Sequence, residues 1–470
     1  MTQTLKTKLN DSSAARWTAL IIVSLTMMFG YFFTDVMSPL EPLLTAAAEE
    51  GGLGWSSDEY GFFSGSYGFF NVFLLLLFFG GIVLDKFGIR FTGIMSTTLM
   101  FVGALIKWYA VSHTFEGMLF GYQTQVIIAC LGFATYGVGC EIVGITATKV
   151  IAKWFTGHEL ALAMGAQVAL ARLGTAAALS LALPFAQQFG GVSASVALGA
   201  ALLCAGVLAF LVYCVMDRKL DKSAAESIGS EPEEVFRMAD LKLLFCNRGF
   251  WYITLLCLMF YAGVFPFLKF ATKLMVIKYG VEADLAGWIP SMLPYGTIVL
   301  TPLFGYVYDR IGKGATLMVI GSVLLTLVHA VFAIPTVNSI GVAVCMMIVL
   351  GVAFGLVPSA MWPSVPKIIP IHLLGSAYAL IFYIQNIGLS LVPIAIGKIN
   401  QANTNAEGVI DYTQTMATFT SFGIIAIIIA TQTTIKIIPP TPKTIDCQEA
   451  KLSMEIARNS SENVSCCGEP

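Results

Sequence analysis

Charged residues inside long apolar runs are the part of this sequence best placed to do chemistry. Glu141 and Arg172 each lie near the middle of such a run, where an ionisable group is costly unless it has a partner or a function. A short polar turn joins the two runs. Counted along a helix from Phe155, Glu141 lies about 21 Å and Arg172 about 25 Å away. A helical hairpin therefore brings the opposite charges to similar depth.

Two interpretations of this pair stay open. In the first, the two side chains bind a solute that carries both signs, with Glu141 taking an ammonium group and Arg172 taking a carboxylate through two parallel hydrogen bonds. In the second, they form a permanent salt bridge that only stabilises the hairpin. We favour the first, because ionisable residues inside a membrane usually serve a function.

Four other charged residues lie within or at the ends of the apolar runs. Asp35 and Lys269 fall near the outer ends of two equivalent runs, where they could extend the site, form an outer gate pair, or reach toward the membrane surface. Lys107 and Lys273 are expected to extend along apolar surface and keep their ammonium groups in water.

Neutral polar and aromatic residues supply further candidates. Trp362 precedes Pro363, which removes a backbone hydrogen bond and can break a helix beside a cavity. Gln385 and Asn386 follow in the next run. These three residues predict an aromatic wall and neutral hydrogen bonders in the site. Simple packing and an interhelical hydrogen bond are the alternatives.

The apolar runs themselves predict an all-α membrane protein. Of the 470 residues, 57% are hydrophobic and 11% are charged, against about 25% charged in soluble domains. Twelve runs approach the roughly 20 residues that cross a bilayer. They start near Trp17, Tyr60, Phe91, Gly121, Leu160, Val192, Gly249, Trp288, Ala315, Ile340, Leu374 and Tyr412.

The twelve spans fall into two six-helix halves. The expected division is an N-tail at 1–16, an N-terminal half at 17–216, a linker at 217–248, a C-terminal half at 249–437 and a C-tail at 438–470. Lys and Arg concentrate in the tails, the linker and alternate loops, and such segments stay in the cytoplasm. Both termini are therefore expected to be cytoplasmic.

A similar phrase closes the second span of each half. Gly80-Gly81-Ile-Val-Leu-Asp85-Lys86-Phe-Gly88-Ile-Arg90 is matched by Gly305-Tyr-Val-Tyr-Asp309-Arg310-Ile-Gly312-Lys313. This repeat resembles the signature loop of the major facilitator superfamily, and the resemblance covers residues 17–437. It implies two halves that rock about a central site. Asp85, Lys86, Arg90, Asp309 and Arg310 would then latch the cytoplasmic side.

Other stretches resemble one branch of that superfamily, which contains a lysosomal dipeptide carrier. The stretches include Gly139-Cys-Glu141, Ala169-Leu-Ala-Arg172, Met361-Trp-Pro363 and Gln385-Asn386-Ile-Gly388. The resemblance implies facilitated diffusion of dipeptides, with Glu141 and Arg172 in the cavity. The segment at 1–16 lacks the acidic dileucine signal of lysosomal members, which favours a cell membrane.

Several classes of function are disfavoured by the sequence. We find no nucleophile with a base, no metal-ligand cluster and no phosphate-binding loop, so we expect neither an enzyme nor a cofactor. A near-neutral charge balance, 26 basic against 28 acidic residues, gives no reason to expect nucleic acid binding. The expected partners are a small solute and lipid around a monomer, with an accessory subunit left open. The main alternative is a proton-coupled anion carrier that uses Arg172, Lys269 and Glu141.

Overall fold

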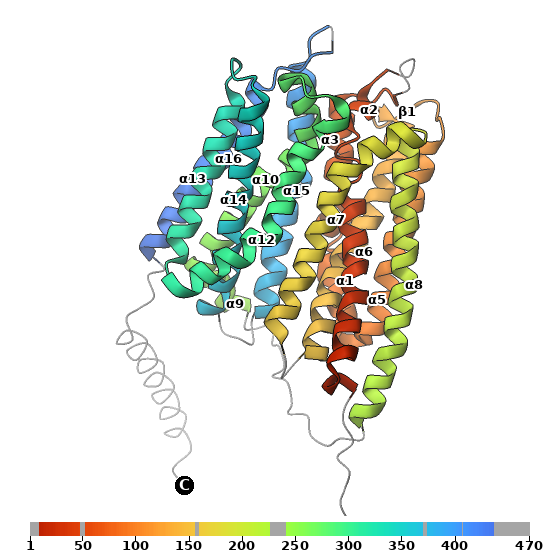
Figure 1. The fold of residues 1–470 in the computed structure, drawn as a ribbon, viewed down its shortest axis with the longest axis vertical. Helices are drawn as coiled ribbons and strands as arrows, with labels where there is room; N and C mark the ends of the chain where they lie inside the picture. Colours follow the sequence, from red (N-terminus) through yellow and green to blue (C-terminus); the bar gives the residue numbers. More distant parts are fainter. Residues whose placement is uncertain are drawn as a thin grey trace, which may run out of the picture.

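The computed structural model is a bundle of long helices that run roughly along one axis (Figure 1). It describes residues 9–47, 52–155, 159–225, 241–369, 374–406 and 408–436. Two groups of helices stand side by side in the view, one formed by the first half of the chain and the other by the second half.

The first group contains the helices that hold Glu141 and Arg172. Its elements are η1 Leu9–Asp11, α1 Ser13–Asp35, α2 Glu41–Thr45, α3 Ser57–Ser66, α4 Phe69–Phe73, α5 Leu76–Ser112, β1 Met118–Leu119, β2 Tyr122–Gln123, α6 Thr124–Phe155, α7 Leu160–Phe189 and α8 Val192–Ala225. The strands β1 and β2 pair as one small antiparallel hairpin.

The second group repeats the pattern of long helices joined by short connections. Its elements are α9 Leu241–Cys246, α10 Arg248–Tyr279, α11 Ala283–Ala286, α12 Trp288–Ile311, α13 Gly314–Ala333, α14 Ile340–Ser364, η4 Val365–Lys367, α15 Leu374–Ala402 and α16 Thr413–Lys436.

Ten helical segments within the described part of the chain are long and apolar enough to cross a membrane. They agree with ten of the twelve predicted spans. The predicted eighth span is α12, a continuous helix that is not among the ten. The predicted second span is broken into α3, α4 and the start of α5. Apolar runs of this length form helices in lipid, because a helix satisfies all of its own backbone hydrogen-bonding groups.

The break in the second span has a clear backbone cause. Leu75 adopts a left-handed conformation with φ 55°, which is unfavourable for a residue that carries a bulky side chain on Cβ. The helix restarts at Leu76 and runs on through Gly88, whose φ of 78° bends it toward the predicted third span. The second and third predicted spans therefore meet in α5.

The predicted linker is partly helical at both ends. Helix α8 continues to Ala225 and α9 starts at Leu241. Residues 226–240, residues 1–8 of the predicted N-tail and the predicted C-tail at 438–470 lie outside the described residues. The predicted domain boundaries therefore stay predictions.

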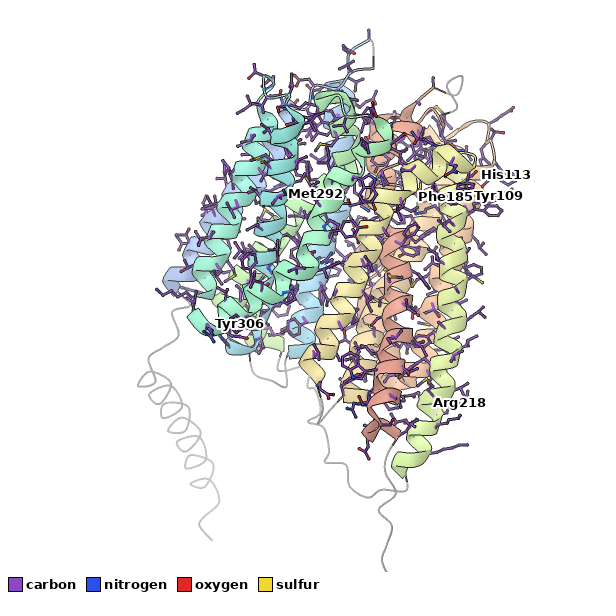
Figure 2. The ribbon with its side chains drawn as sticks, viewed as in Figure 1. Tyr109, His113, Phe185, Arg218, Met292 and Tyr306 are labelled. Atoms are coloured by element: carbon purple, nitrogen blue, oxygen red, sulfur yellow. The ribbon has the colours of Figure 1, made fainter. Side chains whose placement is uncertain are left out.

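The two ends of the bundle are named here by the residues that lie there. The start of α1 and the end of α16 lie at the lower end in Figure 1, which we call the inner end; α2 and β1 lie at the opposite, outer end. Figure 2 shows Arg218 and Tyr306 toward the inner end and Tyr109 and His113 at the outer end. That the inner end faces the cytoplasm remains a prediction.

Glycines allow the two halves to approach closely toward the outer end. A Cβ on Gly61 of α3 would lie 2.6 Å from the carbonyl oxygen of Pro393 in α15, and one on Gly397 would lie 2.6 Å from that of Ser57. Since small residues let helix backbones come together, this seam fixes α3 of the first half against α15 of the second.

Candidate solute-binding site

Glu141 lies on α6, partly buried, with its carboxylate held by the second span. The Tyr67 hydroxyl, just after α3, donates a hydrogen bond of 2.9 Å to Glu141 Oε1. The carboxylate also interacts with the side chain of Asn386 from α15. Residues of both halves therefore surround the acid, and a carboxylate in this setting can bind an ammonium group.

Arg172 lies on α7, and aromatic rings surround its guanidinium group. The guanidinium carbon is 5.9 Å from the centre of the Tyr31 ring, 5.3 Å from Phe265 and 5.0 Å from Phe354. Rings at this range attract a cation by their quadrupoles. Tyr31 belongs to the first half, whereas the two phenylalanines lie on α10 and α14 of the second.

The two charges do not neutralise each other. No ion pair joins the Arg172 guanidinium to the Glu141 carboxylate, both of which are described. Tyr31 interacts electrostatically with both residues, so the same tyrosine lies near both charged side chains. This geometry disagrees with the permanent salt bridge that was the alternative interpretation.

The predicted aromatic wall is formed around Trp362. Its indole donates a 3.1 Å hydrogen bond to the Tyr261 hydroxyl and packs on Phe382, with ring centres 5.1 Å apart. Tyr261 in turn contacts Phe265 and Phe354, the two phenylalanines that face Arg172. Trp362 thus acts on Arg172 indirectly, by supporting the rings that surround the guanidinium group.

The two neutral candidates of α15 have different partners. Gln385 Oε1 accepts a long hydrogen bond from the Cys257 thiol, 3.4 Å away, within the second half. Asn386 donates to the Phe382 carbonyl, 2.9 Å away, and its buried Oδ1 has no hydrogen-bond partner among the described residues. Asn386 therefore adjoins Glu141, whereas Gln385 belongs to the packing of α10 against α15.

Asp35 and Lys269 form an ion pair between the halves. Lys269 Nζ lies 2.6 Å from Asp35 Oδ1 and also donates to the Thr34 carbonyl at 2.9 Å. The Tyr60 hydroxyl donates to the Lys269 carbonyl at 2.7 Å. Of the three roles that the sequence left open for this pair, the geometry fits the gate pair, because α1 and α10 belong to different halves.

The prediction that Lys107 and Lys273 extend into water is wrong. Lys107 has no exposed surface, and Lys273 is 8% exposed. Lys107 Nζ donates to the Phe33 carbonyl, and Lys273 Nζ donates to Thr45 Oγ1 at 2.7 Å. The pattern of apolar residues could not reveal this, because it does not fix the rotation of a helix against its neighbours.

The predicted latch residues of the first half contact other parts of the same half. Arg90 pairs with Asp217 at 3.0 Å and with Asp221 at 2.5 Å, both on α8. Lys153 of α6 pairs with the same two acids, each at 2.7 Å. Lys86 is exposed, and the side chain of Asp85 lies outside what the structure describes.

The corresponding residues of the second half are exposed. Asp309 and Arg310 lie near the end of α12, and the Arg310 guanidinium rests over the ring of Tyr306 at 4.8 Å. Figure 2 shows Tyr306 at the inner end of this half. A latch between the two loops is thus absent among the side chains that are described, and the gating role stays a prediction.

Several residues of the site were not predicted from the sequence. Tyr31, Tyr67 and Phe354 contact the two charges, and Lys107 lies close to the gate pair. Tyrosine in a span was the available signal, because its hydroxyl needs a polar partner when buried. Phenylalanine carries no such signal.

Comparison with known families agrees with this architecture. The family model described as Major Facilitator Superfamily matches residues 13–393. The chain belongs to the major facilitator superfamily. It is therefore a multi-pass membrane transporter of that superfamily, as the repeated loop predicted.

Curated relatives in this superfamily share one name. The protein "Lysosomal dipeptide transporter MFSD1" of Bos taurus is 28% identical over 338 residues, which are 69% of this chain and 68% of that protein. The human protein of the same name is 28% identical over 335 residues, 69% of each chain. The predicted resemblance to that branch of the superfamily is thereby confirmed.

Solved structures share the fold at lower identity. The nucleoside transporter NupG has a TM-score of 0.66 at 17% identity, and the match covers 89% of this chain and 98% of that one. A bacterial homolog of the human lysosomal transporter Spinster, inward-facing and unoccupied, has a TM-score of 0.68 at 14% identity, covering 92% and 100%. At such identities the likeness concerns the fold alone.

Proposed function

We propose that this protein carries a zwitterionic solute such as a dipeptide across the membrane by facilitated diffusion. The observation that carries the proposal is the separation of Glu141 from Arg172. Each charge is partly buried, neither is neutralised by the other, and both are surrounded by side chains of the two halves. A solute with an ammonium group and a carboxylate would supply both missing partners.

The name of the curated relatives supports the same class of solute. Those relatives are called dipeptide transporters, and their similarity extends over about two thirds of each chain. Arg172 is suited to a terminal carboxylate, because its planar group offers paired donors. The rings of Phe265 and Phe354 lie 5.3 and 5.0 Å from its guanidinium carbon, and we propose that its N–H groups bind the solute.

The alternative of a proton-coupled anion carrier has less support. That interpretation needs Lys269 to bind the anion together with Arg172. Lys269 instead pairs with Asp35 at 2.6 Å, so its charge is already neutralised in this conformation.

Thermal stability of the purified protein tests the solute class. A ligand that binds only the folded state raises its melting temperature by mass action. We expect dipeptides to raise it, and expect little change from nitrate, sugars or dipeptides with an amidated C-terminus. Stabilisation by nitrate with none by dipeptides would overturn the proposal.

Substitutions then locate the site. Arg172→Lys keeps the charge but loses the paired donors, so we expect uptake to fall roughly ten-fold or more while the protein reaches the membrane. Glu141→Gln should remove the stabilisation by dipeptides. Arg218→Lys at the exposed inner end of α8 is the matched control, and an equal loss there would refute the assignment.

Uptake into proteoliposomes tests the mode of transport. Facilitated diffusion brings a dipeptide only to equal concentrations, whether or not a pH gradient is present. Accumulation that an uncoupler abolishes would show proton coupling instead.

For its location we propose a cell membrane, with the lysosomal membrane of the named relatives as the alternative. A fluorescent fusion imaged in the source cells distinguishes the two. Signal confined to acidic organelles would overturn this part of the proposal.

A further inference from the structure

The last turn of α1 binds two lysine side chains from different halves. Lys107 Nζ of α5 donates to the carbonyl of Phe33 at 3.3 Å. Lys269 Nζ of α10 donates to the next carbonyl, that of Thr34, at 2.9 Å, and pairs with Asp35 at 2.6 Å. The carbonyls at the C-terminal end of a helix carry partial negative charge. Together with the Asp35 carboxylate they form an acceptor site for cations.

Lys107 is the unusual member of this group. It has no exposed surface, and its ammonium group faces the rings of Phe33 at 3.9 Å, Phe133 at 4.4 Å and Phe63 at 5.7 Å. No carboxylate lies within ion-pair distance of it among the described residues. A buried cation without a counter-ion is costly even where aromatic rings offset part of the loss.

Asp35 is the acid that Lys107 can reach. It lies two residues after Phe33 on the same helix, and its charge and that of Lys269 both act on Lys107. The lysine side chain has four flexible carbons, so a small movement would carry its ammonium group from the Phe33 carbonyl toward the carboxylate.

When the carrier changes conformation, Asp35 requires a second cationic partner in addition to Lys269. Lys269 belongs to α10 of the second half, and the Tyr60 hydroxyl holds its backbone carbonyl. Opening the outer end separates α10 from α1 and therefore withdraws Lys269 from Asp35. A carboxylate left in a mostly apolar setting without a counter-ion would oppose that movement.

We propose that Asp35 exchanges partners during the transport cycle, pairing with Lys269 when the outer end is closed and with Lys107 when it is open. Lys107 would keep the first half neutral after Lys269 withdraws. The inference rests on the alternating access of the proposed function but not on the identity of the solute. In a purely structural role, Lys107 would instead only fill the space between three phenylalanine rings.

Thiol labelling of the outer end separates the two roles. Ser38 is 2% exposed beside the gate pair, so Ser38→Cys reports outer opening to a membrane-impermeant maleimide, with the Ser38 parent as the blank. We expect Lys107→Met, which keeps the length and the ring contacts, to reduce labelling about 10-fold. A filler role predicts no change, and unchanged labelling would overturn the proposal.

A double substitution shows whether the effect acts through Asp35. Asp35→Asn removes the charge that Lys107 is proposed to neutralise. This substitution should therefore increase labelling in the Lys107→Met protein, and the increase should be larger than the one that Asp35→Asn causes in the parent protein. Glu41→Gln in the same background removes a neighbouring carboxylate and should restore nothing. Effects of Lys107→Met and Asp35→Asn that are simply additive would contradict the exchange.

Lys269→Met keeps the inference testable if Lys107→Met fails to fold. This variant should reach the membrane and label more strongly than the parent, because Lys107 remains to pair with Asp35. If Lys269→Met reaches the membrane only together with Asp35→Asn, then Lys107 is not the second partner. The labelling needs no transported solute, so this outcome is independent of the dipeptide assignment.

Discussion

The outer and inner ends of the bundle differ in how the two halves contact each other. Toward the outer end, polar contacts cross between the halves: Lys269 pairs with Asp35, Lys273 donates to Thr45, and the side chain of Gln401 accepts a 3.0 Å hydrogen bond from the Ser57 backbone. These contacts join α1, α2 and α3 to α10 and α15.

Most polar contacts described toward the inner end stay within one half; the hydroxyl of Tyr383 in α15 is an exception, since it donates a 3.2 Å hydrogen bond to the Val72 carbonyl of α4. In the first half, Arg90 and Lys153 share Asp217 and Asp221. In the second, Lys367 donates to the Tyr308 hydroxyl at 2.6 Å. Residues 156–158, 226–240 and 370–373 lie outside the described part of the chain, so the comparison concerns the side chains that the structure describes.

The difference identifies the conformation as one closed at the outer end. It also separates two loops that look alike in the sequence. The loop of the first half holds α5 to α6 and α8 through Arg90, whereas Asp309 and Arg310 of the second half are exposed. One repeated phrase thus has different contacts in the two halves, because among the described residues acids pair with Arg90 of the first half and not with Arg310 of the second.

The largest effect is expected at the glycine seam. A Cβ on Gly65 would lie 2.2 Å from the carbonyl oxygen of Ser390, so Gly65→Leu should force α3 away from α15. Overpacking costs about 1–3 kcal/mol, which corresponds to a roughly 5- to 150-fold shift toward the outer-open conformer. Labelling of Ser38→Cys measures this shift.

The matched control for the seam is Gly165→Leu on α7. Nothing lies within 4 Å of a Cβ at Gly165, so labelling should not change. Equal labelling of the two variants would show that the seam does not close the outer end.

An intermediate effect is expected for the inner cluster, which consists of Arg90, Lys153, Asp217 and Asp221. A substitution there should change stability alone. The Asp217 side chain is 2% exposed and accepts from Arg90, Lys153 and Tyr213. Asp217→Asn should lower the free energy of unfolding by about 2 kcal/mol, since its two cationic partners are about one third exposed and partly screened. The melting temperature should fall while Ser38→Cys labelling stays constant.

The more exposed acid of the same cluster is the control. The Asp221 side chain is 43% exposed, and Asp221→Asn should cost less than about 1 kcal/mol. A change in labelling with Asp217→Asn would mean that the inner cluster also acts between the halves.

The smallest effect is expected from pH at the outer end. Burial raises the pKa of Glu41 from 4.5 to about 8, and the Lys273 ammonium opposes the shift. Tyr60 and Tyr412 also face this carboxyl. A carboxyl that water reaches on opening returns toward its ordinary pKa, so the closed conformer binds the proton more tightly.

Stability of the closed conformer should therefore be greatest at acidic pH and decline as pH rises from about 4.5 to about 8. We expect the return of the pKa on opening to be partial, by about 0.5, which would increase labelling at the outer end about three-fold. Glu41→Gln, which imitates the protonated acid, should remove the increase. Labelling that falls with rising pH would contradict the assignment.

Most of the fold could be predicted from the sequence, because the formation of each membrane-spanning helix depends on residues close together in the chain. A run of about 20 apolar residues must become a helix in lipid, where no water is present to bind its backbone. The repeated loop and the two charges in the fourth and fifth spans then indicated the superfamily and a solute site. None of these inferences required knowledge of which side chains touch.

The sequence could not show the break in the second span at Leu75, since no glycine or proline lies there. It also misplaced Lys107, which is fully buried against three rings. Both depend on neighbouring helices: the fold must compensate for the strained backbone, and the rotation of α5 decides which way Lys107 faces.

By itself, then, the sequence determined that this chain crosses a membrane repeatedly in two related halves and places opposite charges at similar depth. Only the tertiary structure decided which groups the charged side chains contact. Asp35 forms an ion pair with Lys269, and Arg172 lies among aromatic rings from three helices. Hydrophobicity is summed along one helix, whereas the choice of partner depends on the tilt, rotation and register of several helices at once.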